Sequence, residues 1–236
     1  MHIDMDCFFV SVGLRSRPHM RGLPVAVTHS EGGHTPFQIA SCSYEARKMG
    51  VHNGMFVGAA LKLCPDLKTI PYDFEEYQQV ALTLYDTIAQ YTLDIEAVSC
   101  DEMFVDLTEL LFTTKLNIME VISYIRNEIK QKTGCPCSAG IGKNKLQARL
   151  ATKVAKPDGQ YLMQNIQDHI NVLPITELPG VGYSTSFKLE KLNMKTCADL
   201  QKLTLGVLQI EFGRKFGETL YQFCRGIDNR ALQYEH

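Results

Sequence analysis

The sequence lacks the features of a membrane protein and of a zinc protein. Its 236 residues contain no run of about 18 apolar residues, the length that a membrane-spanning helix needs, and it opens in a strand-like pattern instead of a signal peptide. Its eight cysteines are scattered among apolar neighbours, and no two of them have the C-x-x-C spacing of a zinc site. We therefore expect an intracellular protein with reduced cysteines in its core and no membrane contact.

The sequence also has little net charge and no internal repeat. The formal net charge is −2, which argues against a protein that coats DNA through bulk positive charge, so any contact with nucleic acid must be local. Hydrophobic residues make up 45% of the chain, which is enough for one large core or two modest ones. A compact globular fold is therefore expected.

Hydrophobic periodicity predicts an α+β fold with a ferredoxin-like order of elements. Near the start, apolar residues alternate with Asp4 and Asp6, which is the period of a strand. Later segments predict helices over 74–91 and 118–129 and strands over 95–100, 103–107 and 137–141. Together these elements give the order β-α-β-β-α-β, with a small insertion between the first strand and the first helix that is irregular except for a helix-like piece around Tyr44.

Local signals place some of the boundaries. Asn117 and Glu120 fit the N-cap and N3 positions of the second helix, and Gly134 fits its C-terminal stop. A further helix over 144–155 ends at the breaker sequence K-P-D-G, which indicates a domain boundary. The remainder has no β-rich run, so we expect it to be a helical module.

Acidic residues are the strongest candidates for a catalytic site. In the ferredoxin-like order the first strand and the 95–107 hairpin are neighbours, so Asp4 and Asp6 come close to Asp101 and Glu102 at one edge of the sheet. Because adjacent residues on a straight strand face opposite sides, Asp101 and Glu102 must lie at the bend of the hairpin. Three convergent carboxylates suit Mg²⁺ or Mn²⁺, and two such ions about 3.5 to 4 Å apart clamp the oxygens of a phosphoryl transfer.

The alternative for these acids is a solvated turn. An isolated Asp-Glu pair is more often exposed than functional. The D-x-D strand and the predicted order of elements together favour the metal site over that alternative.

Five segments resemble, in order, the motifs of the Y-family translesion DNA polymerases. They are H-I-D-M-D-C-F-F-V-S-V (2–12), S-C-S-Y-E-A-R-K-M-G-V (41–51), A-V-S-C-D-E-M-F-V-D-L-T (97–108), A-G-I-G-K-N-K (139–145) and A-K-P-D-G (155–159). The resemblance covers almost the whole chain, and several motifs in register are more specific than any one of them. Within the family it is strongest to the eukaryotic deoxycytidyl transferases.

The resemblance implies roles for individual residues. Asp4, Asp101 and Glu102, with the main-chain carbonyl of Met5, would be the ligands of two Mg²⁺ ions, for which Mn²⁺ could substitute, and Asp6 would have a structural role. The implied nucleotide contacts are Phe8, Phe9 (under the sugar), Ser41, Tyr44, Arg47 and Lys156, and Met55 and Gly58 would line a pocket over the templating base. A guanidinium, a hydroxyl and an ammonium are the groups that a triphosphate needs. Taken singly, Tyr44 would more often be a core residue, and Arg47 and Lys156 solvated.

Two further features point to DNA contacts. The segment L-P-G-V-G, with Gly180 and Gly182, precedes a helical pattern and resembles a helix-hairpin-helix, whose main-chain N–H groups bind a phosphate. An ordinary tight turn is equally consistent with these five residues alone. Lys143 and Lys145 begin an acid-free basic stretch that ends at Lys156, and a solvated helix face is the alternative interpretation of it.

The resemblance finally implies an organisation and an activity. The palm would comprise 1–8 and 74–160, the fingers 9–73 and the thumb 161–236, with the hairpin near 178–192 and without the family's little finger or the subfamily's N-terminal extension. Such a protein transfers a deoxynucleotide, dCMP from dCTP in the subfamily, to a primer on primer–template DNA opposite damaged bases. A nuclear location and repair partners bound through regions outside this sequence would follow.

Two rival functions remain open at this point. A nucleotide cyclase can share the palm and its acids, but it has no use for the hairpin at Gly180 or for the S-Y-E-A-R segment. A non-catalytic scaffold for DNA or repair partners would tolerate loss of the acids, which are all present here.

Overall fold

The larger part of the chain is built on a five-stranded mixed sheet. The computed structural model describes residues 1–29 and 37–234. In spatial order the strands are β5 (Ile95–Ser99), β6 (Glu102–Val105), β1 (His2–Met5), β7 (Cys137–Ile141) and β8 (Gln160–Leu162). Strands β1, β5, β6 and β7 have the order of a ferredoxin-like sheet, so the predicted α+β topology is confirmed. The strand β1 lies inside the sheet, between β6 and β7.

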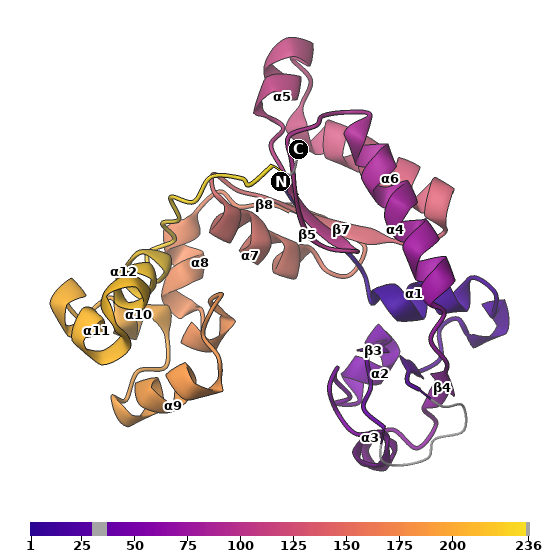
Figure 1. Ribbon diagram of the computed structural model, residues 1–236, viewed down its shortest axis with the longest axis horizontal. Helices are drawn as coiled ribbons and strands as arrows, with labels where there is room; N and C mark the ends of the chain where they lie inside the picture. The colour runs from indigo at the N-terminus through magenta and orange to yellow at the C-terminus, as the bar shows by residue number, and fades with distance from the viewer. Residues whose placement is uncertain (30–36, 235–236) are drawn as a thin grey trace. The chain divides into compact units, whose positions relative to one another are not determined.

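Two long helices, α4 (Phe74–Ala89) and α6 (Ile118–Thr133), lie side by side and cover this sheet (Figure 1). Their apolar residues recur every three or four positions and are buried, Leu84 on α4 and Ile122 on α6 completely so. The Asn117 side chain accepts the N–H groups of Met119 and Glu120 at 2.9 and 3.3 Å, which confirms the predicted N-cap. At the other end Gly134 has φ 71°, a left-handed conformation that glycine adopts without strain.

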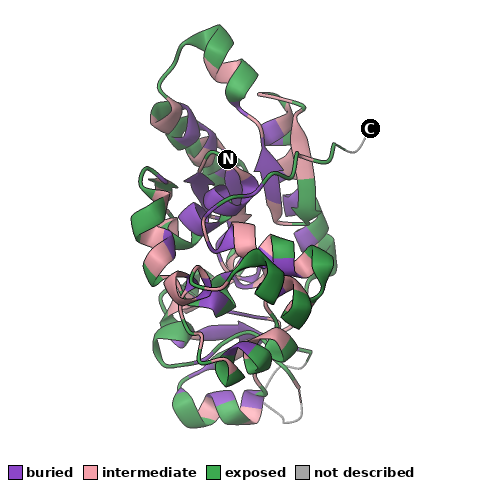
Figure 2. Ribbon diagram, turned by 90° about the vertical axis from the view of Figure 1, so that its left-hand side faces the viewer, coloured by how far each residue is buried: buried purple, intermediate pink, exposed green. Residues whose placement is uncertain are grey.

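The insertion between β1 and α4 carries a small sheet of its own. It contains α1 (Phe8–Leu14), a 3₁₀ turn (Pro18–Met20), the strands β2 (Val25–Val27), β3 (Ser41–Cys42) and β4 (Lys68–Ile70), and the helices α2 (Tyr44–Lys48) and α3 (Val57–Leu63). The strand order is β3-β2-β4. The sequence predicted only the helical piece around Tyr44, because strands of two or three residues are too short to show alternation. Figure 2 shows the buried strands of both sheets in purple.

Residues 140–154 and 161–231 form a second compact unit. Its helices are α7 (Lys145–Ala155), α8 (Ile166–Val172), α9 (Tyr183–Lys191), α10 (Cys197–Leu200), α11 (Leu205–Phe212) and α12 (Arg214–Phe223), with a 3₁₀ turn at Ile175–Glu177. Fully buried leucines form its core, among them Leu146, Leu208 and Leu220. Asp228 accepts the N–H of Leu146 at 3.1 Å, so the last described turn is tied back to α7.

Three expectations about the fold need correction. The segment after residue 156 is not purely helical, because β8 joins the large sheet there; it is three residues long, too short for a period-two signal. The helix α5 (Thr108–Thr114) was not predicted, and it has no buried face, with Phe112 85% exposed. All eight cysteines are free, but Cys100 is exposed in the turn between β5 and β6 instead of lying in a core.

The structure has no helix, within the residues that it describes, that is both long and apolar enough to span a bilayer.

Candidate active site

The register of β1 against β6 brings the predicted acids together. Asp4 lies directly opposite Glu102 in the antiparallel pair, and the N–H of Met5 donates to the carbonyl of Asp101 at 3.0 Å. Strand β5 ends at Ser99 and β6 begins at Glu102, so Asp101 lies in the connecting turn. The two neighbouring acids therefore occupy a bend, as the alternation of side chains on a straight strand required. The backbone register therefore places the three acidic residues beside one another at the end of β1.

A tyrosine on α4 donates hydrogen bonds to the main chain on both sides of this bend. The Tyr85 hydroxyl lies 2.6 Å from the carbonyl oxygen of Ser99 and 3.0 Å from that of Glu102. The same hairpin has an irregular register between Ala97 and Ser99. In the sequence Tyr85 belonged only to the apolar face of a helix, and nothing there indicated that its hydroxyl reaches a hairpin.

The acids lie in an environment that disfavours negative charge. Burial raises the pKa of Asp4 to about 7; the Lys156 ammonium opposes the rise, and the charges of Asp101 and Glu102 add to it. Burial also raises the pKa of Asp101, against the hydrogen bond from Ser99 and together with the charge of Glu102. A bound cation would relieve both effects, because it neutralises carboxylates that the protein has crowded together.

Each of the three acids has a partner within the protein. The Lys156 Nζ lies 3.4 Å from Asp4 Oδ2, and the Nε2 of the buried His2 lies 2.7 Å from Glu102 Oε1. Ser99 Oγ donates to Asp101 Oδ1 at 2.7 Å. In the part of the chain that the structure describes, no three acidic, histidine or cysteine side chains surround a common point as a finished metal cage. The donor set itself consists of carboxylate and carbonyl oxygens, which fits Mg²⁺ or Mn²⁺.

Asp6 is placed differently from the other acids. It is 1% exposed, and its two oxygens accept hydrogen bonds from Ser138 Oγ at 2.8 Å and from the N–H of Asp158 at 2.6 Å. The Asp6 carboxylate therefore fixes the loop that contains Asp158.

The residues predicted to bind the triphosphate lie near the acids. The Arg47 guanidinium lies over the Tyr44 ring, 4.8 Å from its centroid, and its Nε donates to the Cys42 carbonyl at 3.1 Å. The Tyr44 hydroxyl is buried and has no hydrogen-bond partner among the described residues. Burial raises the pKa of Tyr44, and the nearby charges of Asp6 and Asp4 contribute. This hydroxyl is therefore close to the acidic edge, the part of the large sheet that carries Asp4, Asp101 and Glu102. Ser41 is buried in β3.

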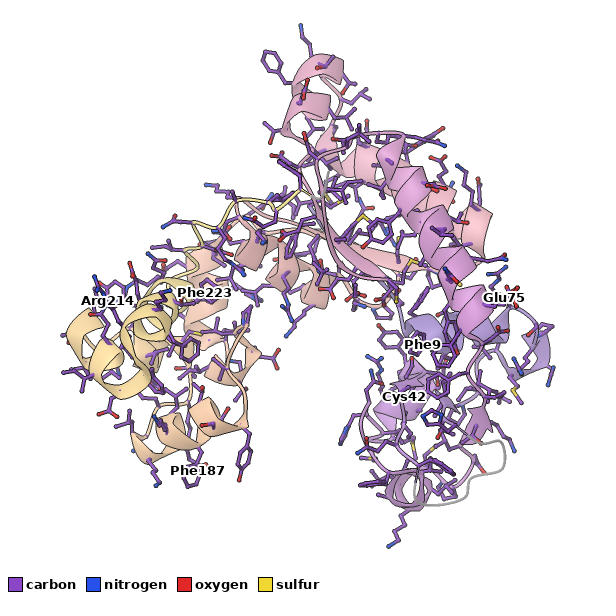
Figure 3. The ribbon with its side chains drawn as sticks, viewed as in Figure 1. Phe9, Cys42, Glu75, Phe187, Arg214 and Phe223 are labelled. Atoms are coloured by element: carbon purple, nitrogen blue, oxygen red, sulfur yellow. The ribbon has the colours of Figure 1, made fainter. Side chains whose placement is uncertain are left out.

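The two phenylalanines at the start of α1 differ in burial. Phe8 is 5% exposed and packs in the core. Phe9 is half-buried and stacks on Tyr77, with ring centroids 4.3 Å apart and an angle of 18°. In Figure 3 it lies between α4 and Cys42 of the small sheet. No pattern in the sequence indicated that Tyr77 would stack on Phe9.

The residues predicted to lie over the templating base belong to the insertion. Met55 is half-buried against the core of the small sheet, and Gly58 is in the first turn of α3.

In the helical unit the predicted hairpin is present as a turn before α9. Gly180 has φ 85° and is exposed, and Gly182 is the N-cap of α9. The element before the turn is the 3₁₀ turn at Ile175–Glu177. The first N–H groups of α9 therefore follow an exposed glycine turn, the geometry that binds phosphate.

The two lysines predicted to contact DNA differ. Lys143 is exposed, whereas Lys145, the first residue of α7, is only 7% exposed. The exposure of Lys143 suits a phosphate contact, and the burial of Lys145 does not.

Two family models match the chain. Residues 3–153 match the impB/mucB/samB family, and residues 176–228 match the thumb domain of DNA polymerase iota. The first match covers the strands β1, β5, β6 and β7 of the large sheet, the insertion and nearly all of α7. The second covers the glycine turn and the helices α9 to α12.

The chain is also similar to curated DNA repair proteins. It is 50% identical over 283 aligned residues to DNA repair protein Rev1 of Drosophila melanogaster, covering 100% of the chain and 28% of the relative. It is 44% identical to REV1 of Arabidopsis thaliana, covering 98% of the chain and 21% of the relative. DNA polymerase IV of Shewanella woodyi is 41% identical, with 98% of the chain and 63% of the relative covered.

The length of the match limits what these relatives say about the chain. The chain spans between about a fifth and just over a quarter of the length of the Rev1 proteins, so it corresponds to one part of them. Within that part the acidic edge, the insertion and the glycine turn all fall inside the matched residues. The chain therefore belongs to the impB/mucB/samB family, the Y-family of translesion DNA polymerases.

Proposed function

We propose that this chain transfers a deoxynucleotide, dCMP, from a dNTP to the 3′-hydroxyl of a primer opposite damaged bases. Y-family polymerases are metal-dependent DNA-directed nucleotidyltransferases, and Rev1-like members act in DNA repair. The observation that carries the proposal is the β1–β6 register, which sets Asp4 opposite Glu102, next to Asp101 and Lys156.

In this proposal Asp4, Asp101 and Glu102, together with the Met5 carbonyl, would hold two Mg²⁺ ions. When bound, the ions would supply Lewis-acid stabilisation of the attacking and leaving oxygens. The raised pKa values of Asp4 and Asp101 support the assignment, because perturbed acids that share one edge are typical of functional sites.

The nucleotide is assigned to the groups around Tyr44. Arg47 presents a guanidinium, Lys156 an ammonium and Tyr44 a buried hydroxyl without a partner among the described residues, and a triphosphate oxygen would satisfy that hydroxyl. Ser41 and the N–H of Phe8 would add phosphate contacts. Phe9, held by Tyr77, would lie under the sugar and exclude a ribose 2′-hydroxyl. Met55 and Gly58 would line the pocket over the templating base.

The DNA is assigned to the turn at Gly180 and Gly182 and to Lys143. Exposed N–H groups at the start of α9 would bind a backbone phosphate without reading sequence. We further propose that 1–8 and 74–160 form the palm, 9–73 the fingers and 161–236 the thumb. The thumb-domain match over 176–228 supports the last of these divisions.

The choice of dCTP as the substrate and a nuclear location follow from the Rev1 relatives. Three proteins named Rev1, from a fly, a plant and a yeast, are 40 to 50% identical to the chain. Bacterial DNA polymerase IV proteins are also similar, at up to 41% identity. Incorporation of dCMP opposite every template base would separate the Rev1-like activity from the template-directed activity of an ordinary polymerase. Repair partners would bind regions outside this chain.

The test is single-nucleotide primer extension. The parent protein should extend a primer with dCTP and Mg²⁺, and the double variant Asp101→Ala, Glu102→Ala should lose at least about 10³-fold in kcat/KM, because it removes two of three proposed metal ligands. The matched control is Glu75→Ala, Glu76→Ala, which removes two adjacent acids from the first turn of α4. Its activity should equal that of the parent.

Two outcomes would contradict the proposal. Equal activity of the parent and the Asp101→Ala, Glu102→Ala variant would remove these acids from catalysis. DNA binding without any incorporation by the parent would favour a scaffold.

A further inference from the structure

We propose that Arg126 and Asp6 are positioning residues that fix the Lys156 ammonium for the incoming triphosphate. The inference rests on the proposed function, because it assigns a role to residues behind the nucleotide site. The two residues hold opposite sides of the connection that carries Lys156, which we call the lysine turn (156–159).

The lysine turn has no regular structure of its own. Helix α7 ends at Ala155 and β8 begins at Gln160, so residues 156–159 depend on side-chain contacts for their position. Lys156 Nζ lies 3.4 Å from Asp4 Oδ2, 3.4 Å from the Met5 carbonyl oxygen and 3.6 Å from Asp6 Oδ1. Its ammonium therefore stands directly at the acidic edge, and any shift of the turn moves it.

Asp6 holds the inner side of the turn. One carboxylate oxygen accepts the N–H of Asp158 at 2.6 Å, and the other accepts the Ser138 hydroxyl at 2.8 Å. The Gly159 N–H in turn donates to Ser138 Oγ at 3.4 Å, and its carbonyl accepts the Ala139 N–H at 3.0 Å. The buried carboxylate thus binds the turn directly and through β7.

Arg126 of α6 holds the outer side. Its guanidinium donates from Nε to the Cys137 carbonyl, from Nη1 to Gln160 Oε1 and from Nη2 to Asp158 Oδ1, each at 3.0 Å. The side chain is 15% exposed. Three nitrogens of one planar group therefore join β7, the lysine turn and β8, and a lysine at this position has no such fork.

Asp158 links the two sides. Its N–H is bound by Asp6, and its carboxylate is bound by Arg126 and, at 2.9 Å, by Lys130. The residue two positions after Lys156 is therefore held in two directions by charge-assisted hydrogen bonds, which are stronger and more directional than neutral ones. A group that stabilises transferred phosphate must be placed this closely, because a displacement of about 1 Å costs about 10²-fold in rate.

The test is a double-mutant cycle between Arg126 and Lys156 in the full-length protein. We expect Arg126→Gln to raise the KM for dCTP about five- to tenfold and to leave the KM for primer–template DNA unchanged. In a Lys156→Met background the same substitution should change the KM for dCTP less than twofold, because the group that it positions is gone. Arg126→Lys should restore the KM only in part.

The matched control is Lys132→Gln on the same helix, which removes a cation that pairs with Glu128 instead of the lysine turn. It should behave as the parent. A second variant, Ser138→Ala, removes one hydrogen bond to Asp6 and should raise the KM for dCTP by about two- to fivefold in the parent background alone.

The outcomes separate this inference from the proposed function. Equal effects of Arg126→Gln with and without Lys156, or no effect at all, would overturn the positioning role while the polymerase assignment stands. If the parent binds dCTP with Ca²⁺ but does not incorporate it, the same double-mutant cycle is measured on the Kd for dCTP. Arg126→Gln should then raise that Kd in the parent background and not in the Lys156→Met background. A parent that neither binds nor incorporates dCTP would overturn both.

Discussion

The acidic edge of the large sheet and the glycine turn of the helical unit, both proposed to bind phosphate groups, are built in different ways. The acidic edge uses half-buried side-chain charges: burial raises the pKa of Asp4 to about 7, and Lys156 and His2 lie in contact with the acids. The glycine turn presents main-chain N–H groups at the exposed start of α9, after Gly180 with φ 85°. In the proposed function, catalysis would thus depend on specific charged residues, whereas DNA binding at the turn would depend on backbone shape.

The largest effect is expected from removing one carboxylate of the acidic edge, which should abolish catalysis without changing the glycine turn. Asp4→Asn keeps the size of the side chain but removes the charge, and we expect kcat/KM for dCTP to fall at least about 10³-fold. Primer extension with single nucleotides measures the loss. Retention of more than a tenth of the activity would show that Asp4 is not a ligand.

The same variant should make the metal-free fold more stable at neutral pH. The folded pKa of Asp4, about 7, lies above its ordinary value of 3.8. The protonated acid therefore contributes its full stabilisation of the fold below pH 3.8, and this contribution is lost as the pH rises from 3.8 through 7. Asp4→Asn should therefore gain about 1 to 4 kcal/mol in free energy of unfolding at pH 7.5 and much less at pH 4.5. Urea unfolding with EDTA at both values measures it, and an equal gain at both would contradict the assignment.

Phe9 tests whether shape as well as charge matters at the acidic edge. Phe9→Ala should relax discrimination against ribonucleotides by about 10- to 200-fold, because the ring that would meet a 2′-hydroxyl is gone. The ratio of kcat/KM for dCTP to that for CTP measures this. The control is Phe74→Ala, an exposed ring of the same aromatic group that stacks on Tyr72. Its ratio should match that of the parent.

The glycine turn can be tested by a pair of similar substitutions. Gly180→Ala puts a Cβ at φ 85° and 3.3 Å from Phe216, which strains the turn, and we expect the Kd for primer–template DNA to rise about 5- to 20-fold. Gly182→Ala has no atom within 4 Å of the new Cβ and should change the Kd less than twofold. Fluorescence anisotropy measures both. Equal effects of the two substitutions on the Kd would mean that the backbone conformation at Gly180 does not determine DNA binding.

The smallest expected effect comes from a single surface charge. Lys143→Gln should weaken DNA binding only modestly, and it should reduce the slope of log Kd against log salt by about 0.9, the value for one phosphate contact. Lys145→Gln should leave that slope unchanged, because Lys145 is buried. A salt titration of binding distinguishes them.

The sequence predicted the features that repeat along one element. The apolar periodicity of α4 and α6 and the cap at Asn117 were recoverable from local pattern, and the order of β1, β5, β6 and β7 followed from the β-α-β-β-α-β sequence of elements. The bend at Asp101 followed from the alternation of side chains on a strand. Short elements were missed: the small sheet and β8 have strands of two or three residues, and α5 has no buried face.

Side-chain contacts between segments that do not pair as neighbouring strands could not be predicted. Asp6 reaches Ser138 across 132 positions and Asp158 across 152, and no pattern in either segment indicates the meeting. The burial of Lys145 is similar, since its place at the start of α7 suggested an exposed charge. Residues that hold the site, such as Tyr85 and Arg126, were therefore visible only in the structure.

The partners of the acids have a consequence for how the site is loaded. Asp4 is already in contact with the Lys156 ammonium, Glu102 with the His2 ring, and Asp101 is held by Ser99. In the proposed function, taking up a cation would therefore be an exchange of ligands, in which an ammonium, an imidazole and a hydroxyl give way. Unlike a zinc finger, whose apo chain is unfolded, the acidic edge would not need the ion in order to fold.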